Sequence, residues 1–413
     1  MSRSPVGAST AMLRRMVRSG RVHTGILASA ASSAAGFALA ITQAHTVSTS
    51  EFGAFAVATA LGALIIGTSR SAIAEPALAV TVGAAEIRIA VRQASLLALV
   101  IGLPLLAGAW WADLPYLAVV AITLPGLLVY DTVRTLRLAV VAPRRALVLD
   151  VGWAAGTVGL CLLTFPGWIT GIWCFAGWAG IAAVLGAVSA GRAGYLGRPG
   201  WPRSQVSTGT SVAFGADYVV GSGSATVATN LIAGFAGTLV VASIRGAGTI
   251  LGPVTLVVGI LPTLLIPTLR RMQEGLHSPD GSIVRLATLL TVLAVPPLAV
   301  IAWFPAVWGE LLLADVWPLA QPLLPLLAWE LLATLSAMVP FAGHRALLAG
   351  QASLVVRSVL AGVRIVAIVW AGVALGAMAA AAAMAAIATL SSVLWWISYV
   401  TQMRRRGRLG AAV

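Results

Sequence analysis

Long runs of apolar residues, separated by short polar connections, recur along the whole chain. A helix needs about 20 mainly apolar residues to cross the hydrocarbon core of a bilayer. The segments that meet this requirement are residues 24–45, 52–74, 88–111, 116–138, 146–166, 170–191, 209–232, 238–266, 284–304, 316–340, 354–374 and 376–400. Only a weak break around Gly372 and Gly376 divides the last two. The pattern predicts an all-α, polytopic membrane protein with about 12 transmembrane helices.

The composition supports this interpretation. Of the 413 residues, 59% are hydrophobic and 9% are charged, whereas soluble domains have about 45–50% apolar and about 25% charged residues. A surface so poor in charge requires lipid as its solvent, so the expected partner is the lipid bilayer. Soluble enzymes, nucleic-acid binders, secreted disulfide scaffolds and disordered proteins are all disfavoured. Cys161 and Cys174 lie inside apolar runs and are interpreted as small buried hydrophobic residues.

The basic residues, all of them arginines, alternate between the connections. The connections at 46–51, 112–115, 167–169, 233–237 and 305–315 contain none, whereas the intervening connections and both termini contain several. Because positive residues accumulate on the cytoplasmic side, we expect both termini to be cytoplasmic and the protein to lie in the cell membrane.

The polar, Gly- and Pro-rich stretch RAGYLGRPGWPRSQVST, residues 192–208, interrupts the middle of the chain. It predicts two lobes of six spans each. The expected organisation is a basic cytoplasmic N-terminus at 1–22, an N-lobe at 23–191, a cytoplasmic linker at 192–208, a C-lobe at 209–400 and a basic cytoplasmic tail at 401–413.

The chain lacks the signatures of enzymes. We find no catalytic pair of carboxylates, no Ser-His-Asp set, no phosphate-binding loop and no metal-spaced histidine cluster in the sequence. We therefore expect no catalytic residue, no cofactor and no metal site. The histidines, His23, His45, His277 and His344, are interpreted as polar residues at membrane edges or in cytoplasmic loops.

Charged residues inside predicted spans are the main candidates for function, because a charge in hydrocarbon is costly and faces a polar interior or a partner. They are Asp217, Arg245, Glu330 and Arg364. Arg357 lies two helical turns before Arg364 and shares its face, from which it can reach the cytoplasmic interface. These charges either pair with one another to hold helices together, or line a cationic cavity that binds a substrate.

A second charged group lies at the predicted cytoplasmic ends of the N-lobe spans: Arg70, Glu75, Asp131, Arg134 and Asp150. Asp131 and Arg134 are three residues apart on one helix, a spacing typical of a local ion pair. The group either fixes the inner end of the bundle or forms a cytoplasmic gate.

Two segments resemble a known family. EFGAFAVATAL, followed by SRSAIAEPALAV, is similar to the opening of bacterial polysaccharide-biosynthesis flippases. The more specific segment is GTLVVASIRGAGTILGPVTLVVGILPTLLIPTLRRM, which resembles that family's eighth span. The matching positions are Arg245, Gly246, Ala247, Gly252, Pro253, Pro267, Arg270 and Arg271.

The resemblance implies membership of the multidrug/oligosaccharidyl-lipid/polysaccharide exporter superfamily. Its fold is two six-helix bundles arranged as a V around a central cavity. The implied function is translocation of a lipid-pyrophosphate-linked oligosaccharide, by alternating access and without ATP hydrolysis, for surface polysaccharide assembly. Arg245 and Arg364 would fit the arginine-rich cavity that is common in the family.

Two alternatives remain open. A cation-coupled drug exporter of the same superfamily would use Asp217 or Glu330 to exchange a proton, and the coupling ion would be H⁺ or Na⁺. A membrane polymerase or ligase of surface glycans is disfavoured, because the longest outer connection, 305–315, contains no arginine.

Overall fold

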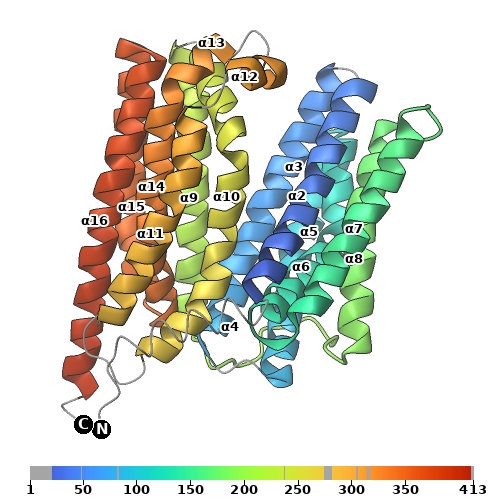
Figure 1. Cartoon of the computed structure of the whole chain (residues 1–413). Coiled ribbons are helices and arrows are strands. Elements are labelled where there is room, and N and C mark those ends of the chain that lie inside the picture. The colour runs from blue at the N-terminus through green and yellow to red at the C-terminus, as the bar shows by residue number, and fades with distance from the viewer. Residues whose placement is uncertain are drawn as a thin grey trace. The chain divides into compact units, whose positions relative to one another are not determined.

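The computed structural model describes residues 21–47, 49–80, 83–236, 238–273, 281–303, 306–313 and 317–410. Outside short connections these residues are helical, and none of them lies in a β-strand (Figure 1). They form two compact units, residues 21–215 and residues 216–410. The division falls inside helix α9 (Thr208–Ala236), just after the connection 192–208. The all-α fold expected from the apolar runs is confirmed.

The first unit is built from long helices and two π-helical segments. Its elements are α2 (Arg21–Thr46), α3 (Thr49–Ser69), η1 (Arg70–Ala74), α4 (Glu75–Leu78), α5 (Ala84–Trp111), α6 (Pro115–Leu136), η2 (Arg137–Val141), α7 (Pro143–Thr164) and α8 (Gly171–Arg192). Because α3, η1 and α4 follow one another without a break, the second span extends beyond its predicted end to Leu78.

The second unit contains most of α9 and all the helices that follow (Figure 1). These are α10 (Thr238–Gln273), α11 (Gly281–Ala302), α12 (Ala306–Leu313), α13 (Trp317–Ala320), η4 (Gln321–Leu323), α14 (Leu324–Ala346), α15 (Gly350–Leu375) and α16 (Ala377–Gly410). The helix α10 continues through three internal prolines, Pro253, Pro262 and Pro267.

Ten helices in the described ranges are long and apolar enough to cross a membrane, and α2 contains a further apolar stretch, Leu27–Gln43. The helix α9 is itself 29 residues long. Each predicted span therefore has a helix. The weak break before the last span is real: Gly376 has φ +83°, a conformation that suits glycine, and it separates α15 from α16. The chain is a multi-pass membrane protein.

Small residues bring α6 and α8 of the first unit into close contact. A Cβ atom placed on Gly186 would lie only 2.7 Å from the Cα atom of Tyr130. Elsewhere in the unit, the buried ring of Phe175 on α8 packs edge-on against Phe55 of α3, with centroids 5.4 Å apart. In lipid the hydrophobic effect contributes little to the association of helices. Close backbone contacts of this kind therefore supply much of the packing energy.

In the second unit, α14 and α16 are joined by polar contacts. The Ser336 and Ser392 hydroxyl oxygens are 2.6 Å apart. The imidazole of His344 donates from Nδ1 to the carbonyl of Pro340 at 2.8 Å and accepts from the Ser398 hydroxyl at 2.9 Å. The side chain of His344 is fully buried. His344 lies in the last turn of α14, at the end of a span as expected, but its imidazole is buried in the bundle and both ring nitrogens have partners on α14 and α16.

Candidate functional site

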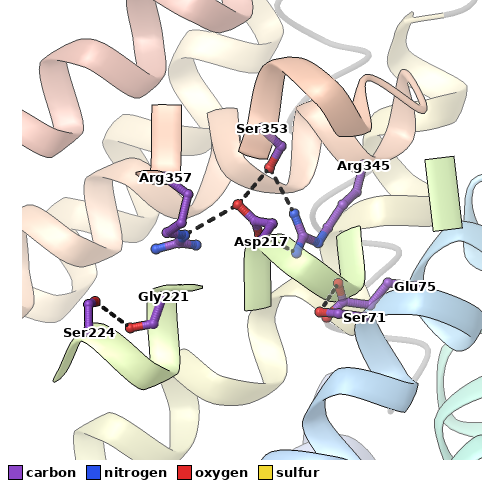
Figure 2. Close-up of polar contacts among 8 residues, drawn as sticks. All are labelled: Ser71, Glu75, Asp217, Gly221, Ser224, Arg345, Ser353 and Arg357. Carbon is purple, nitrogen blue, oxygen red and sulfur yellow. Dashed lines mark hydrogen bonds and ion pairs between the residues drawn. The ribbon is translucent and has the colours of Figure 1, made fainter. Parts of the chain in front are cut away.

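The polar centre of the second unit is Asp217 on α9. Its Oδ2 atom accepts a hydrogen bond from Nη2 of Arg345 at 2.9 Å, and its Oδ1 atom lies 3.4 Å from Nε of Arg357. The Ser353 hydroxyl donates to Oδ1 at 3.2 Å and accepts from Nη1 of Arg345 at 3.3 Å. Figure 2 shows the carboxylate of Asp217 between the two guanidinium groups, with the Ser353 hydroxyl contacting both Asp217 and Arg345.

Burial makes this cluster energetically demanding. The side chains of Asp217 and Arg345 are both 0% exposed, whereas that of Arg357 is 29% exposed. Taking charges out of water costs several kcal/mol for each ion, which good geometry and further hydrogen bonds must offset. In this structure Asp217 is therefore a counter-ion enclosed by the protein.

Aromatic rings complete the surroundings of the two guanidinium groups. The Cζ atom of Arg345 lies 4.0 Å from the ring centroid of Phe341, and that of Arg357 lies 5.1 Å from the same centroid. Arg357 also lies 5.3 Å from the ring of Trp395. Cations within about 6 Å of a ring centroid are attracted by the π-electrons, so these rings fix where Arg357 lies.

Glu330 on α14 and Arg364 on α15 form a second ion pair. Nη2 of Arg364 lies 3.4 Å from Oε1 of Glu330, and the two side chains are 34% and 20% exposed. Charge-assisted hydrogen bonds are usually about 2.7–2.9 Å long. The pair is therefore loose, and most N–H groups of Arg364 remain available to another acceptor.

A cavity of about 110 Å³ lies beside this pair, within the second unit. Helices α9, α14, α15 and α16 enclose it, and its polar wall includes Ser224, Glu330, Arg357, Arg364 and Ser391. Two arginines and one carboxylate thus line one cavity, whose remaining wall is largely apolar.

Arg245 lies apart from this cavity. Its side chain on α10 is exposed, it does not line the cavity, and Thr249 donates a hydrogen bond to its main-chain carbonyl at 3.0 Å. The residues selected from the sequence for substrate binding therefore do not form one cluster. Asp217 lies in the buried cluster, Glu330 and Arg364 pair at the cavity, and Arg245 is separate.

In the first unit, the expected local pair between Asp131 and Arg134 is wrong. Asp131 forms a two-pronged ion pair with Arg70 of η1, in which Nε and Oδ2 are 3.0 Å apart. Arg134 instead binds Asp150 of α7 through Nε, at 2.7 and 2.8 Å from the two carboxylate oxygens. Each residue thus has a partner on another element, at a distance typical of a charge-assisted hydrogen bond.

Two further contacts complete this end of the first unit. The Tyr130 hydroxyl donates to Oδ1 of Asp150 at 2.5 Å. Glu75 is buried and accepts a hydrogen bond from the Ser71 hydroxyl at 3.1 Å. The structure thus brings together Arg70 with Asp131 and Arg134 with Asp150, and Glu75 contacts Ser71.

Sequence reasoning missed two buried arginines. Because Arg345 follows the predicted span 316–340, it was expected in a cytoplasmic connection, but it lies in the last turn of α14. Arg137 is also buried, where Nη2 donates to the carbonyl of Ser189 at 3.2 Å. The available signal for a buried Arg345 was the apolar sequence around it, since apolar residues resume directly after it.

No protein-family model matches the chain, and no curated protein matches it. Solved structures do. A MATE in complex with MaD3S has a TM-score of 0.74 at 13% identity, over 94% of this chain and 95% of that one. A multidrug resistance MATE transporter of the MOP superfamily, in an outward-facing conformation, has a TM-score of 0.68 at 11% identity, over 94% of both chains.

A third similar structure is a MOP superfamily transporter from Pyrococcus furiosus. It has a TM-score of 0.70 at 12% identity and covers 92% of this chain and 94% of its own. At such low identity the likeness establishes the fold. The chain has the two-bundle, all-helical fold of the MATE transporters of the MOP superfamily.

Proposed function

We propose that this chain, which has the fold of the MATE transporters, is a membrane flippase for an anionic, lipid-pyrophosphate-linked oligosaccharide. It would move this substrate across the cell membrane by alternating access during surface polysaccharide assembly. The similar solved structures support a transporter in general. The flippase assignment rests on the resemblance of the second and eighth spans and on the charge of the second unit.

The observation that carries the proposal is an excess of guanidinium groups around the cavity. Arg357 and Arg364 are partly exposed there, and each reaches its carboxylate only at 3.4 Å. Pyrophosphate oxygens are well matched to guanidinium groups, which offer planar, two-pronged donors. An anionic head group would thus find donors that are already positioned and not fully used.

The residues would then have different roles. Arg364 and Arg357 would bind the head group, and the exposed Arg245 on α10 would offer a further positive charge. Glu330 would hold Arg364 until the substrate arrives, and Asp217 would position Arg357 without touching the substrate. In the first unit, the Arg70–Asp131 and Arg134–Asp150 pairs, with Glu75, would act as a cytoplasmic gate.

A cation-coupled drug or small-molecule exporter is the second candidate. The observation that favours it is Glu330, a carboxylate at the cavity that can exchange a proton for a cationic substrate. One of the similar structures is a multidrug resistance transporter. Another, the MOP superfamily transporter from Pyrococcus furiosus, is described as having a binding pocket of reverse polarity, which suggests a different function. The charge of the pocket is therefore the property to test. In either case H⁺ or Na⁺ would be the coupling ion.

Reconstituted proteoliposomes discriminate the two candidates. One assay follows the accessibility of a fluorescent lipid-pyrophosphate-linked oligosaccharide to an impermeant lectin, and the other follows efflux of a cationic dye. The flippase proposal predicts lipid translocation that Arg364→Gln abolishes and Arg364→Lys restores in part, since lysine lacks the two-pronged donor.

Dye efflux without lipid translocation would contradict the flippase assignment. A second outcome would show that Arg364 does not bind the substrate. In that outcome Arg364→Gln lowers protein abundance, and adding Glu330→Gln restores both abundance and transport. In that case Arg364 would only be a structural partner of Glu330.

A further inference from the structure

The polar connection between α8 and α9 lies against the beginning of α5 in the first unit. Nε of Arg88 donates a hydrogen bond to the carbonyl oxygen of Gly194 at 3.0 Å. Nε of Arg92 donates to the carbonyl oxygen of Arg198 at 2.9 Å. In return, the amide of Gly200 donates to the carbonyl oxygen of Arg92 at 3.3 Å. The first part of the connection is therefore held in a defined position on α5.

A further basic segment, the end of α6 with η2 and the start of α7, meets the same connection. Arg137 of η2 donates from Nη2 to the carbonyl oxygen of Ser189, near the end of α8, at 3.2 Å. Its Cζ atom lies 5.8 Å from the ring centroid of Tyr195 in the connection. Arg145, in the first turn of α7, is close enough to Arg137 for the two charges to interact. Three basic segments thus come together at one end of the first unit.

The charge at this end is almost entirely positive. The segments 84–92, 137–145 and 192–208 contain a single acid, Glu86, and that residue is buried. The carboxylates of the ion pairs described above are buried in the bundle as well. The exposed arginines of the three segments are Arg88, Arg144, Arg145, Arg192, Arg198 and Arg203. A surface with one sign of charge attracts a partner of the opposite sign, so the expected partner is an anion.

These arginines lie at the ends of membrane spans. Arg144 is the second residue of the span Pro143–Thr164, and Arg192 is the last residue of the span Gly171–Arg192. Because a span ends where the hydrocarbon core ends, lipid phosphates lie at this level. The connection also exposes Trp201, a residue type that is enriched at membrane interfaces. Arginine beside exposed tryptophan fits a lipid surface better than a dissolved anion.

We propose that this end of the first unit is a binding surface for the phosphate groups of anionic membrane lipids. Arg88 and Arg92 donate to the connection only from Nε. Their terminal amino groups form no hydrogen bond with the described residues and are donors for phosphate oxygens. Guanidinium groups bind phosphate through two parallel hydrogen bonds, and the connection holds these two in place. The surface lies outside the cavity and does not depend on which substrate the protein moves.

The test is lipid binding to the purified full-length protein in a non-ionic detergent. Native mass spectrometry follows the titration of a phosphatidylglycerol and of a phosphatidylcholine with the same acyl chains, and thermal unfolding is measured in parallel. We expect phosphatidylglycerol to bind more tightly and to raise the unfolding temperature more. This preference should decrease as salt is added, because exposed charges are screened. Glycerol phosphate, a dissolved source of the same phosphate group, should bind weakly.

Variants locate the surface. Arg198→Gln with Arg203→Gln removes two exposed charges of the connection. It should weaken phosphatidylglycerol binding by about tenfold, which corresponds to about 1.4 kcal/mol, and leave phosphatidylcholine binding unchanged. Arg198→Lys with Arg203→Lys should retain part of the binding, because lysine keeps the charge and lacks the two-pronged donor. The matched control is Arg404→Gln with Arg405→Gln, which removes two exposed charges of α16 in the other unit and should change binding little.

Two kinds of result would overturn this inference. One is equal binding of the two lipids, or an equal loss in the Arg198/Arg203 and Arg404/Arg405 glutamine variants. The other is tight binding of single-stranded DNA, lost in the Arg198/Arg203 variant, without a preference for phosphatidylglycerol, which would assign the surface to a dissolved polyanion. Because the transport assays can be run in liposomes of phosphatidylcholine alone, neither result would affect the flippase proposal.

Discussion

Asp217 on α9 accepts a hydrogen bond from Arg345 on α14 across 2.9 Å, and neither side chain is exposed at all. The pair joins α9 and α14, which are far apart in the sequence, and stabilises the packing of these helices in the second unit. A pair of this kind is more sensitive to the loss of one partner than to the replacement of both, because a lone buried charge has no compensation.

The first prediction concerns this pair. Asp217→Asn removes a buried carboxylate that two arginines, Arg345 and Arg357, share, and should destabilise the protein by about 3–5 kcal/mol. Abundance in the membrane and thermal unfolding in detergent measure this loss. The double variant Asp217→Leu with Arg345→Met also removes the carboxylate of Arg357, whose side chain is 29% exposed, and should recover part of the stability. If the double variant is less stable than Asp217→Asn, the pair is not the source of the effect.

Replacing the carboxylate of the second ion pair by an amide should have only a small effect on the stability of the protein. Glu330→Gln removes a carboxylate that is 20% exposed and 3.4 Å from its partner, and partly exposed pairs contribute about 0–1 kcal/mol. Thermal unfolding of Glu330→Gln should therefore stay close to that of the native protein. A loss as large as that of Asp217→Asn would show that the pair is structural.

The third prediction tests the close contact of α6 and α8. Gly186→Ala places a Cβ atom 2.7 Å from the backbone of Tyr130, so the helices must separate, at a cost of about 1–3 kcal/mol. Gly180→Ala on the same helix is the control, since nothing lies within 4 Å of its added Cβ atom. Equal unfolding temperatures for the two variants would contradict this packing.

The fourth prediction concerns the proposed gate. Reversing one charge of the Arg70–Asp131 pair, as Arg70→Asp or Asp131→Arg, places like charges together and should strongly reduce transport. The double exchange restores opposite charges and should recover most of it. Unfolding temperatures of all three variants separate a gating effect from a folding effect. Failure of the double exchange, with normal stability, would show that the pair does not act as a unit.

The fifth prediction concerns orientation. Trp168, 76% exposed in the connection between α7 and α8, is expected outside the cell, whereas Ser204 is expected in the cytoplasm. Trp168→Cys should react with an impermeant thiol reagent in intact cells, and Ser204→Cys only after permeabilisation. The native Cys161 and Cys174 are buried and should give little background. The opposite labelling pattern would invert the topology.

The sequence by itself determined the helices of this protein. Apolar runs are a local property, and a span must be apolar over its length whatever it packs against. For this reason each predicted span has a helix, and the break at Gly376 was visible as a weakness between two apolar runs. The charged residues inside the spans also stood out, because charge in hydrocarbon is rare.

Only the tertiary structure decided which charges meet. Asp217 and Arg345 are 128 residues apart, and no local pattern relates them. Asp131 and Arg134 were expected to pair because they are neighbours on one helix, yet each found a partner on another helix. Arg345 was expected in a connection because it lies beyond the predicted span 316–340, yet α14 continues to Ala346 and buries it. The physical reason is that a charge is tolerated inside a bundle when a counter-charge is brought to it, and the packing of helices, not the order of residues, brings it there.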